Sequence, residues 1–200
     1  MSFEWLGDRA VRFMRPAVAA RALVREVRTW PGVVDVVVAG EDIALYFASP
    51  TAAQAALDDR LRAALANLAT LTDDDEPGRE HVLRAIYDGP DLEDVSLATG
   101  LSVADVIAAH SAAEYTVALM GFAPGFAYLD GLDARLELPR RPTPRPRIAA
   151  GSLAFAGAQT AVYPFAGPGG WHLIGRVIET RMFDEHGPLL ALGDRVRFTR

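Results

Sequence analysis

The chain has 200 residues, a formal net charge of −6 and no cysteine, and half of its residues are hydrophobic. This length suits one large domain or two small ones, and the composition is typical of a globular protein. Without cysteine, the chain can form no disulfide, thiolate nucleophile or cysteine-ligated metal centre. The acidic balance also argues against general binding to nucleic acids.

All 20 basic residues are arginine. A Walker-type phosphate loop places a lysine against the β- and γ-phosphates, a Schiff-base enzyme needs an amine, and a biotin carrier attaches its cofactor to lysine. These three classes of protein are therefore excluded for this chain.

The sequence contains no apolar run near the roughly 20 residues that a membrane-spanning helix needs. Its first five residues, Met-Ser-Phe-Glu-Trp, lack the basic and apolar regions of a signal peptide. We expect a cytoplasmic protein that does not contact a membrane.

Residues 1–88 are predicted to form a small ferredoxin-like α/β domain. Apolar and β-branched runs indicate strands, i, i+3, i+4 spacing of apolar residues indicates helices, and Ser49-Pro50 is typical of a helix start. The resulting order is β-α-β-β-α-β, the split unit of ferredoxin-like domains. The segments are residues 10–14, 17–29, 33–38, 43–47, a helix from Pro50 that carries Leu57, Leu61, Ala64, Leu65 and Leu68 on one face, and a strand over residues 81–87, after an acidic loop at residues 72–78.

Two short helices follow, the first capped by Asp91 and the second by Ser102. Residues 97–108 superficially resemble a helix-turn-helix DNA reader. No arginine lies between Arg84 and Arg135, however, so this segment has no cation to meet phosphates. We therefore expect no nucleic-acid partner.

From Tyr115 onward, short apolar runs are separated by glycine and proline. Closely spaced strands with turn signals indicate a β-barrel or a β-sandwich. Within this part, residues 121–129 alternate glycines with aromatic residues, which suggests tight turns that hold rings against a core or a pocket.

Residues 138–147 place four arginines in a proline-stiffened, extended segment. Side chains alternate along extended backbone, so Arg145 and Arg147 should share a side. Guanidinium groups match carboxylate and phosphate geometry. We expect Arg140, Arg145 and Arg147 to contact an anion or a partner; the alternative is a solvated basic edge.

Two further turns carry Gln159-Thr160 and, after Pro168-Gly169-Gly170, Trp171. Glutamine both donates and accepts hydrogen bonds, which suits an amide or lactam group. The alternative is that these turns only close the barrel, with Trp171 in its core. The four histidines, His81, His110, His172 and His186, show no metal-ligand spacing, so no metal site is predicted. The sequence also does not identify a catalytic residue.

The second half of the sequence resembles the family of 5-oxoprolinase B subunits, also called allophanate hydrolase subunit 1. The resemblance runs from Glu114-Tyr115 to the closing Gly193-Asp194-x-Val196-x-Phe198. Between them, in family order and spacing, lie Gly121-Phe122-x-Pro124-Gly125-Phe126-x-Tyr128-Leu129, Pro139-Arg140-Arg141, Pro144-Arg145, Gly151-Ser152, Gln159-Thr160, Tyr163-Pro164, Pro168-Gly169-Gly170-Trp171 and Ile174-Gly175-Arg176.

This resemblance implies a cyclophilin-like β-barrel over residues 89–200, behind the small α/β domain. It implies an enzyme complex, with a homologous C subunit and a third, A-type subunit, that opens 5-oxo-L-proline to L-glutamate with ATP. We expect this chain to be inactive alone and not to bind ATP alone. In such a complex Gln159, Thr160 and Trp171 are expected to line one substrate pocket, with Arg176 meeting the carboxylate.

Two other functions stay open on the same resemblance. Related chains form half of the carboxyltransferase domain of urea carboxylase, so the substrate would be urea or a related amide. Another relative inhibits a sporulation histidine kinase. The sequence does not choose among these functions.

Overall fold

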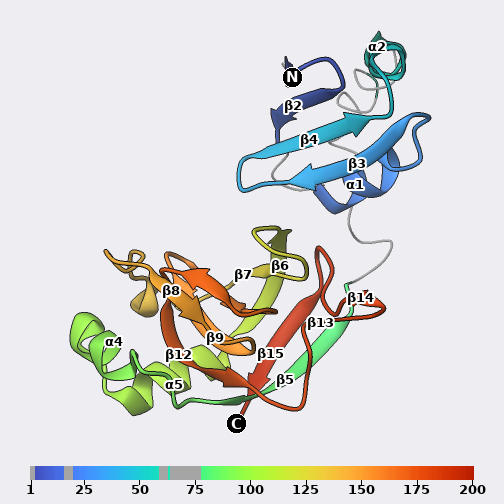
Figure 1. Ribbon diagram of the computed structural model, residues 1–200. Coiled ribbons are helices and arrows are strands. Elements are labelled where there is room, and N and C mark those ends of the chain that lie inside the picture. The colour runs from blue at the N-terminus through green and yellow to red at the C-terminus, as the bar shows by residue number, and fades with distance from the viewer. Residues whose placement is uncertain (1–2, 16–19, 59–62, 64–77) are drawn as a thin grey trace. The chain divides into compact units, whose positions relative to one another are not determined.

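The computed structural model describes residues 3–15, 20–58, 63 and 78–200 (Figure 1). Contacts divide the chain into two units, Met1–Pro77 and Gly78–Arg200. The boundary that we predicted after residue 88 therefore moves to Pro77. The cause is strand β5 (Glu80–Ile86), which pairs with strands of the second unit and not with the first.

The first unit contains a four-stranded antiparallel sheet in the order β1-β2-β4-β3. Strands β2 and β3 both run antiparallel to β4, so they are parallel to each other and α1 connects them. This is the split β-α-β of a ferredoxin-like domain. The place beside β2 is held by β1 and not by the predicted last strand. The elements are β1 (Phe3–Trp5), β2 (Ala10–Met14), α1 (Ala20–Val27), β3 (Val33–Val38), β4 (Asp42–Phe47) and α2 (Pro50–Asp58).

Alternation along these strands defines one buried face of the sheet. On β4, Ile43, Leu45 and Phe47 are buried, whereas Tyr46 between them is exposed. This period of two is what a sheet covered on one face requires. The predicted helical positions Leu61, Ala64, Leu65 and Leu68 and the acidic loop at residues 72–77 lie outside the described residues.

The second unit is built on a closed barrel with the strand order β10-β7-β6-β15-β5-β12-β9. All neighbours in the barrel are antiparallel except β15 and β5, which are parallel. The predicted β-barrel is therefore confirmed. Besides β5, the barrel strands are β6 (Glu114–Met120), β7 (Ala127–Asp130), β9 (Ser152–Ala156), β10 (Gln159–Val162), β12 (His172–Val177) and β15 (Arg195–Thr199). Two separate two-stranded sheets are formed by β8 (Arg145–Ile148) with β11 (Gly167–Gly169) and by β13 (Phe183–Asp184) with β14 (Gly187–Pro188).

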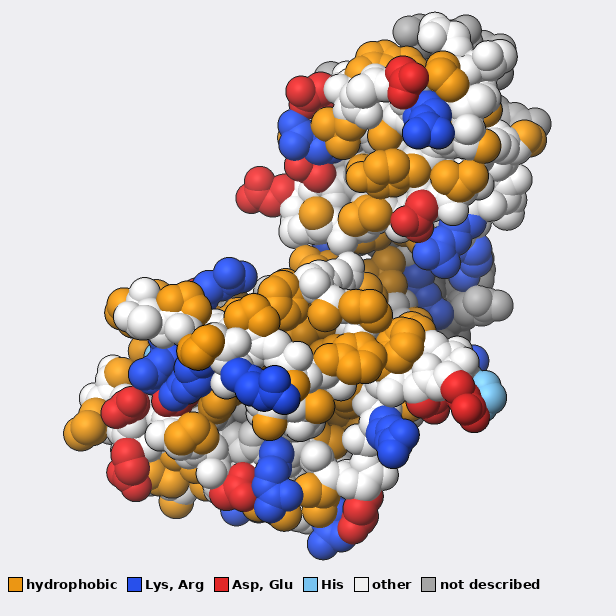
Figure 2. Space-filling view, in the orientation of Figure 1, with side chains coloured by type: hydrophobic (Ala, Val, Ile, Leu, Met, Phe, Trp, Pro, Cys, Tyr) orange, Lys and Arg blue, Asp and Glu red, His pale blue; other side chains and the backbone are white. Residues whose placement is uncertain are grey.

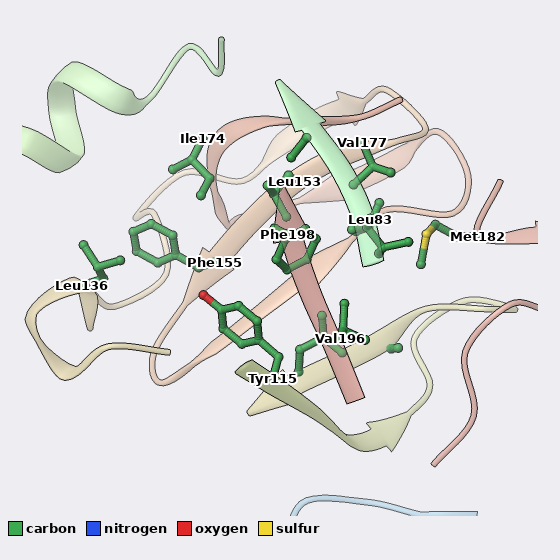
Figure 3. Packing of buried hydrophobic residues seen from close by; sticks show 14 of the residues in the cluster. Leu83, Tyr115, Leu136, Leu153, Phe155, Ile174, Val177, Met182, Val196 and Phe198 are labelled. Carbon is green, nitrogen blue, oxygen red and sulfur yellow. The ribbon is translucent and has the colours of Figure 1, made fainter. Parts of the chain in front are cut away.

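Large apolar side chains from several strands meet inside the barrel (Figure 3). Each one that is fully buried stabilises the fold by about 1.5–3 kcal/mol relative to exposure. The fully buried members include Tyr115, Leu129, Leu136, Leu153, Phe155, Ile174 and Val196. A second cluster, around Phe126, Tyr163 and Trp171, lies next to it.

Two helices, α4 (Leu92–Thr99) and α5 (Val103–Ala112), precede β6. Gly100 ends α4 in the left-handed conformation with φ of 72°, and Ser102 caps α5 by accepting from the Asp105 backbone N–H. Among the described residues no single helix is long and apolar enough to cross a membrane; α4 and α5 would do so only as a pair, and the chain bends by 93° between them.

A buried carboxylate secures the junction of the first and last barrel strands. Asp194 is 3% exposed and accepts from the backbone N–H groups of Arg79 and Ala191, both at 2.9 Å. Its Oδ2 also lies 3.0 Å from His81 Nε2. Residues in or next to both β5 and β15, which pair with each other in the barrel, thus contact the Asp194 carboxylate.

Candidate functional site

The second unit carries an open cleft with a volume of about 660 Å³. Its polar members are Asp130, Arg140 and Gln159, and the rest of its wall is apolar or backbone. The full lining is Asp130, Gly131, Leu132, Pro139, Arg140, Ala156, Gly157, Ala158, Gln159 and Trp171. Three residues that the sequence predicted for binding, Gln159, Trp171 and Arg140, therefore meet in one place.

Gln159 begins β10 and lies directly opposite Asp130 at the end of β7. Its Nε2 donates to Asp130 Oδ1 at 2.7 Å. Because an ionised carboxylate only accepts, this bond fixes which end of the amide carries nitrogen. Gln159 keeps its Oε1 and its second N–H for other partners.

Trp171 is both a core residue and a cleft wall. The residue is 5% exposed, and its ring packs edge-on against Phe126 and Tyr128 with centroid distances of 5.9 and 5.7 Å. The remaining surface lines the cleft. Trp171 thus belongs to the buried aromatic cluster and also lines the cleft, and its role in binding a substrate stays a prediction.

The glycine-aromatic run is organised around Phe126, which is 2% exposed. Its ring contacts Phe122, Tyr128, Tyr163 and Trp171, as the sequence suggested for rings held by tight turns. Phe122 itself is 64% exposed and has a positive φ of 71°, which is uncommon for a residue with a side chain. Figure 2 shows other hydrophobic side chains gathered on the same unit.

The four arginines of the extended segment divide into two pairs. Arg141 Nη1 and Arg145 Nη2 both donate to Oδ1 of Asp91, at 2.8 and 2.6 Å. Asp91 is 1% exposed, and its Oδ2 accepts from the Leu173 backbone N–H at 2.7 Å. Arg145 therefore anchors its segment to the barrel, and the structure gives its guanidinium an internal carboxylate.

Arg140 and Arg147 are exposed and, among the described residues, have no ion-pair or hydrogen-bond partner. Arg140 lines the cleft, whereas Arg147 does not. Burial raises the pKa of the Tyr128 and Tyr163 hydroxyls, and the positive charge of Arg140 opposes that rise for both. Arg140 is thus the cation that the segment contributes to the cleft.

Thr160 does not line the cleft. It is fully buried, and its hydroxyl donates to the Ala154 carbonyl at 2.9 Å and lies 2.9 Å from His110 Nε2. The expected pocket hydroxyl is therefore part of the barrel interior. Because successive side chains of a strand point to opposite faces, Gln159 and Thr160 could not both face the cleft.

The Thr160 contact also fixes the tautomer of His110. Since the threonine hydroxyl is already donating to Ala154, His110 Nε2 must donate to it, and Nδ1 then accepts from Tyr87 Oη at 2.9 Å. Complete burial lowers the pKa of His110 to about 3, so the ring is neutral at ordinary pH.

Arg176 is likewise outside the cleft lining. It lies on β12 opposite Ile86 and Ser152, and its Nε donates to Asp88 at 3.0 Å on the surface. The structure thus does not place this guanidinium with Gln159. Within the cleft, Arg140 is the residue that can meet a carboxylate.

Sequence reasoning missed Asp130, His110 and the cation-binding role of Asp91. Asp130 stands between Leu129 and Gly131 in no recognisable motif, and only strand pairing brings it opposite Gln159. Among the described residues, no three His, Asp or Glu side chains come together in a group that could hold a metal ion.

Comparison with known proteins addresses the family. The family model for the carboxyltransferase domain, subdomain C and D, matches residues 2–191. The 5-oxoprolinase B subunit of Bacillus subtilis (strain 168) is 35% identical over an alignment of 219 positions, gaps included, which covers 98% of this chain and 91% of the relative. The chain belongs to the family of 5-oxoprolinase B subunits.

Further similarities agree with this family. The 5-oxoprolinase B subunit of Escherichia coli O157:H7 is 48% identical over 113 residues, 55% of this chain and 51% of the relative. The crystal structure of TTHA0988 superposes with a TM-score of 0.76 at 35% identity and covers 96% of this chain, which spans only 39% of TTHA0988.

A more distant likeness concerns the fold alone. The K. lactis urea amidolyase matches 98% of this chain with a TM-score of 0.69 at 16% identity, over 14% of its own length. This chain therefore shares its fold with a part of this much larger protein.

Proposed function

We propose that this chain is the B subunit of an ATP-dependent 5-oxoprolinase, which opens 5-oxo-L-proline to L-glutamate together with its homologous C subunit and its A subunit. The observation that carries the proposal is the 35% identity to the B. subtilis protein across almost the whole length of both chains. The cleft supports it, because an amide, a guanidinium and an indole line one cavity.

ATP is a substrate of the proposed complex, and the cleft of this chain does not suit it. A triphosphate needs several cations or a ring of backbone N–H groups. The cleft lining has one cation, Arg140, and an opposing carboxylate, Asp130. We therefore assign nucleotide binding to another subunit or to an interface with it.

The proposal is tested by co-expressing the chain with the C and A subunits and measuring ATP hydrolysis and glutamate formation. Both should depend on 5-oxoproline, and the purified chain alone should show neither. Hydrolysis by the isolated chain, or full activity of the complex without it, would contradict the assignment.

One alternative has a specific observation in its favour. The matching family model is that of a carboxyltransferase domain, and the barrel fold occurs in urea amidolyase. A carboxyltransferase-type subunit would act on urea or a related amide. Offering the same purified complex urea together with carboxybiotin as the carboxyl donor distinguishes the two: urea-dependent carboxyl transfer without 5-oxoproline turnover would favour the alternative. No observation described above favours regulation of a histidine kinase.

A further inference from the structure

Two side chains in the cleft keep unused hydrogen-bonding capacity. Gln159 donates one N–H to Asp130 and retains one donor and one acceptor in the plane of its amide. Arg140 lines the cleft and has no hydrogen-bond or ion-pair partner among the described residues, although Arg141 and Arg145 beside it both bind Asp91. An unpaired guanidinium in a concave site suits a carboxylate or phosphate.

The shape of the polar groups indicates what Gln159 can bind. A planar amide presents one N–H and one C=O, and a cyclic amide holds both on the same edge. The free Oε1 of Gln159 can accept from such an N–H, and its remaining N–H can donate to such a C=O. The methylene groups of such a ring would meet the apolar part of the wall, which is made by Leu132, Pro139, Ala156 and Trp171.

The charges indicate how the ligand is oriented. Asp130 holds Gln159 in place and puts a negative charge at that end of the cleft. A ligand carboxylate at the same end would be repelled, whereas an amide N–H would not. The carboxylate is therefore directed to Arg140.

We propose that the cleft binds a cyclic amide that carries a carboxylate, with Gln159 contacting the amide edge and Arg140 the carboxylate. This inference rests on the proposed function and adds to it the place of the substrate and the role of each residue. Asp130 acts through Gln159 as a positioning residue.

The test uses the complete complex and two competitors of 5-oxoproline that each keep one half of it. 2-Pyrrolidinone has the lactam without the carboxylate, and cyclopentanecarboxylate has the carboxylate without the amide. Arg140→Met should raise the inhibition constant of cyclopentanecarboxylate about tenfold or more, because a charge-assisted contact is lost, and leave that of 2-pyrrolidinone within about twofold.

Gln159→Ala should show the opposite pattern, weakening 2-pyrrolidinone and sparing cyclopentanecarboxylate. Arg140→Lys, which keeps the charge and loses the fork, should recover part of the lost affinity. Arg181→Met is the matched control, since Arg181 is exposed and lies outside the cleft lining, and neither constant should move. A general loss of structure would shift both inhibitors alike.

The outcomes separate the two proposals. If the wild-type complex does not turn over 5-oxoproline, the proposed function is wrong. If it does, but neither compound competes, or Arg140→Met and Gln159→Ala affect both compounds equally or not at all, the cleft assignment is overturned while the proposed function stands.

Discussion

His110 is a titratable side chain that the folded protein keeps wholly inside the barrel. Its pKa is about 3 in the folded state because burial disfavours the charged ring, against an ordinary value of about 6.5 in the unfolded chain. Above pH 6.5 the ring is neutral in both states and contributes no pH dependence. Between pH 6.5 and 3 only the unfolded chain takes up the proton, so the stability falls as the pH falls.

As the pH falls from 7.5 to 5, protonation of this ring in the unfolded chain should lower the free energy of unfolding by about 2 kcal/mol. Urea unfolding of wild type and His110→Gln across this range measures it, and the variant should lack that part of the slope. His186→Gln is the control, because His186 is exposed. Equal slopes for His110→Gln and wild type would refute the prediction; an imidazole NMR titration of the wild type checks it independently.

For individual residues, the sequence predicted some of the side chains that line the cleft. Gln159, Trp171 and Arg140 were predictable because an amide, an indole and a guanidinium in turns or extended segments are chemically distinctive. Thr160 was misplaced although strand alternation with Gln159 could have excluded it. Arg176 was chosen by charge alone, and nothing local to it shows that Asp88 is its partner.

Strand β11 offers a sharp comparison between two glycines that are two residues apart. A Cβ added to Gly169 would lie 2.2 Å from the Tyr163 hydroxyl and 2.6 Å from Ile148 Cδ1, whereas a Cβ on Gly167 would meet nothing within 4 Å. Neither glycine has a positive φ, so a difference in backbone strain would not explain a difference between alanine substitutions at the two positions.

Gly169→Ala should therefore lower the free energy of unfolding by about 1–3 kcal/mol through overpacking against the aromatic cluster. Gly167→Ala should change it by no more than about 0.5 kcal/mol. Chemical denaturation of both variants is the measurement. Equal costs for the two would mean that the close approach of β11 to Tyr163 is not maintained in solution.

Element by element, the sequence indicated the strands better than their partners. Residues 81–87 were correctly predicted as a strand but assigned to the first domain. The alternation of buried Leu83 and Ala85 with exposed neighbours is the same whichever sheet a strand joins. Pairing with β12 and β15 is a long-range property that local pattern does not contain.

For the whole molecule, the position of the boundary has a direct experimental consequence. All seven barrel strands and both of its apolar clusters lie within residues 78–200. A fragment of residues 78–200 should unfold cooperatively, because its core is complete. A fragment of residues 89–200 follows the boundary that the sequence suggested; it lacks β5 and should not.

Circular dichroism melts of the two fragments make this comparison. The shorter one removes one of the two neighbours of β12 and one of the two neighbours of β15, and it takes Leu83 and Ala85 out of the core. Two cooperative melts with similar midpoints would show that β5 is dispensable and would restore the boundary at residue 88.

The parallel pairing of β5 with β15 also determines how late in translation the barrel can close. Arg79 and Asp194, which hydrogen-bond beside this pair, are 115 residues apart in the chain. During translation β5 must wait for almost the entire second unit before its neighbour exists, and closing so long a loop is slow. Until then the apolar strands of an unclosed barrel stand open to other chains. Production of this protein should therefore benefit from added chaperones more than from any single stabilising substitution.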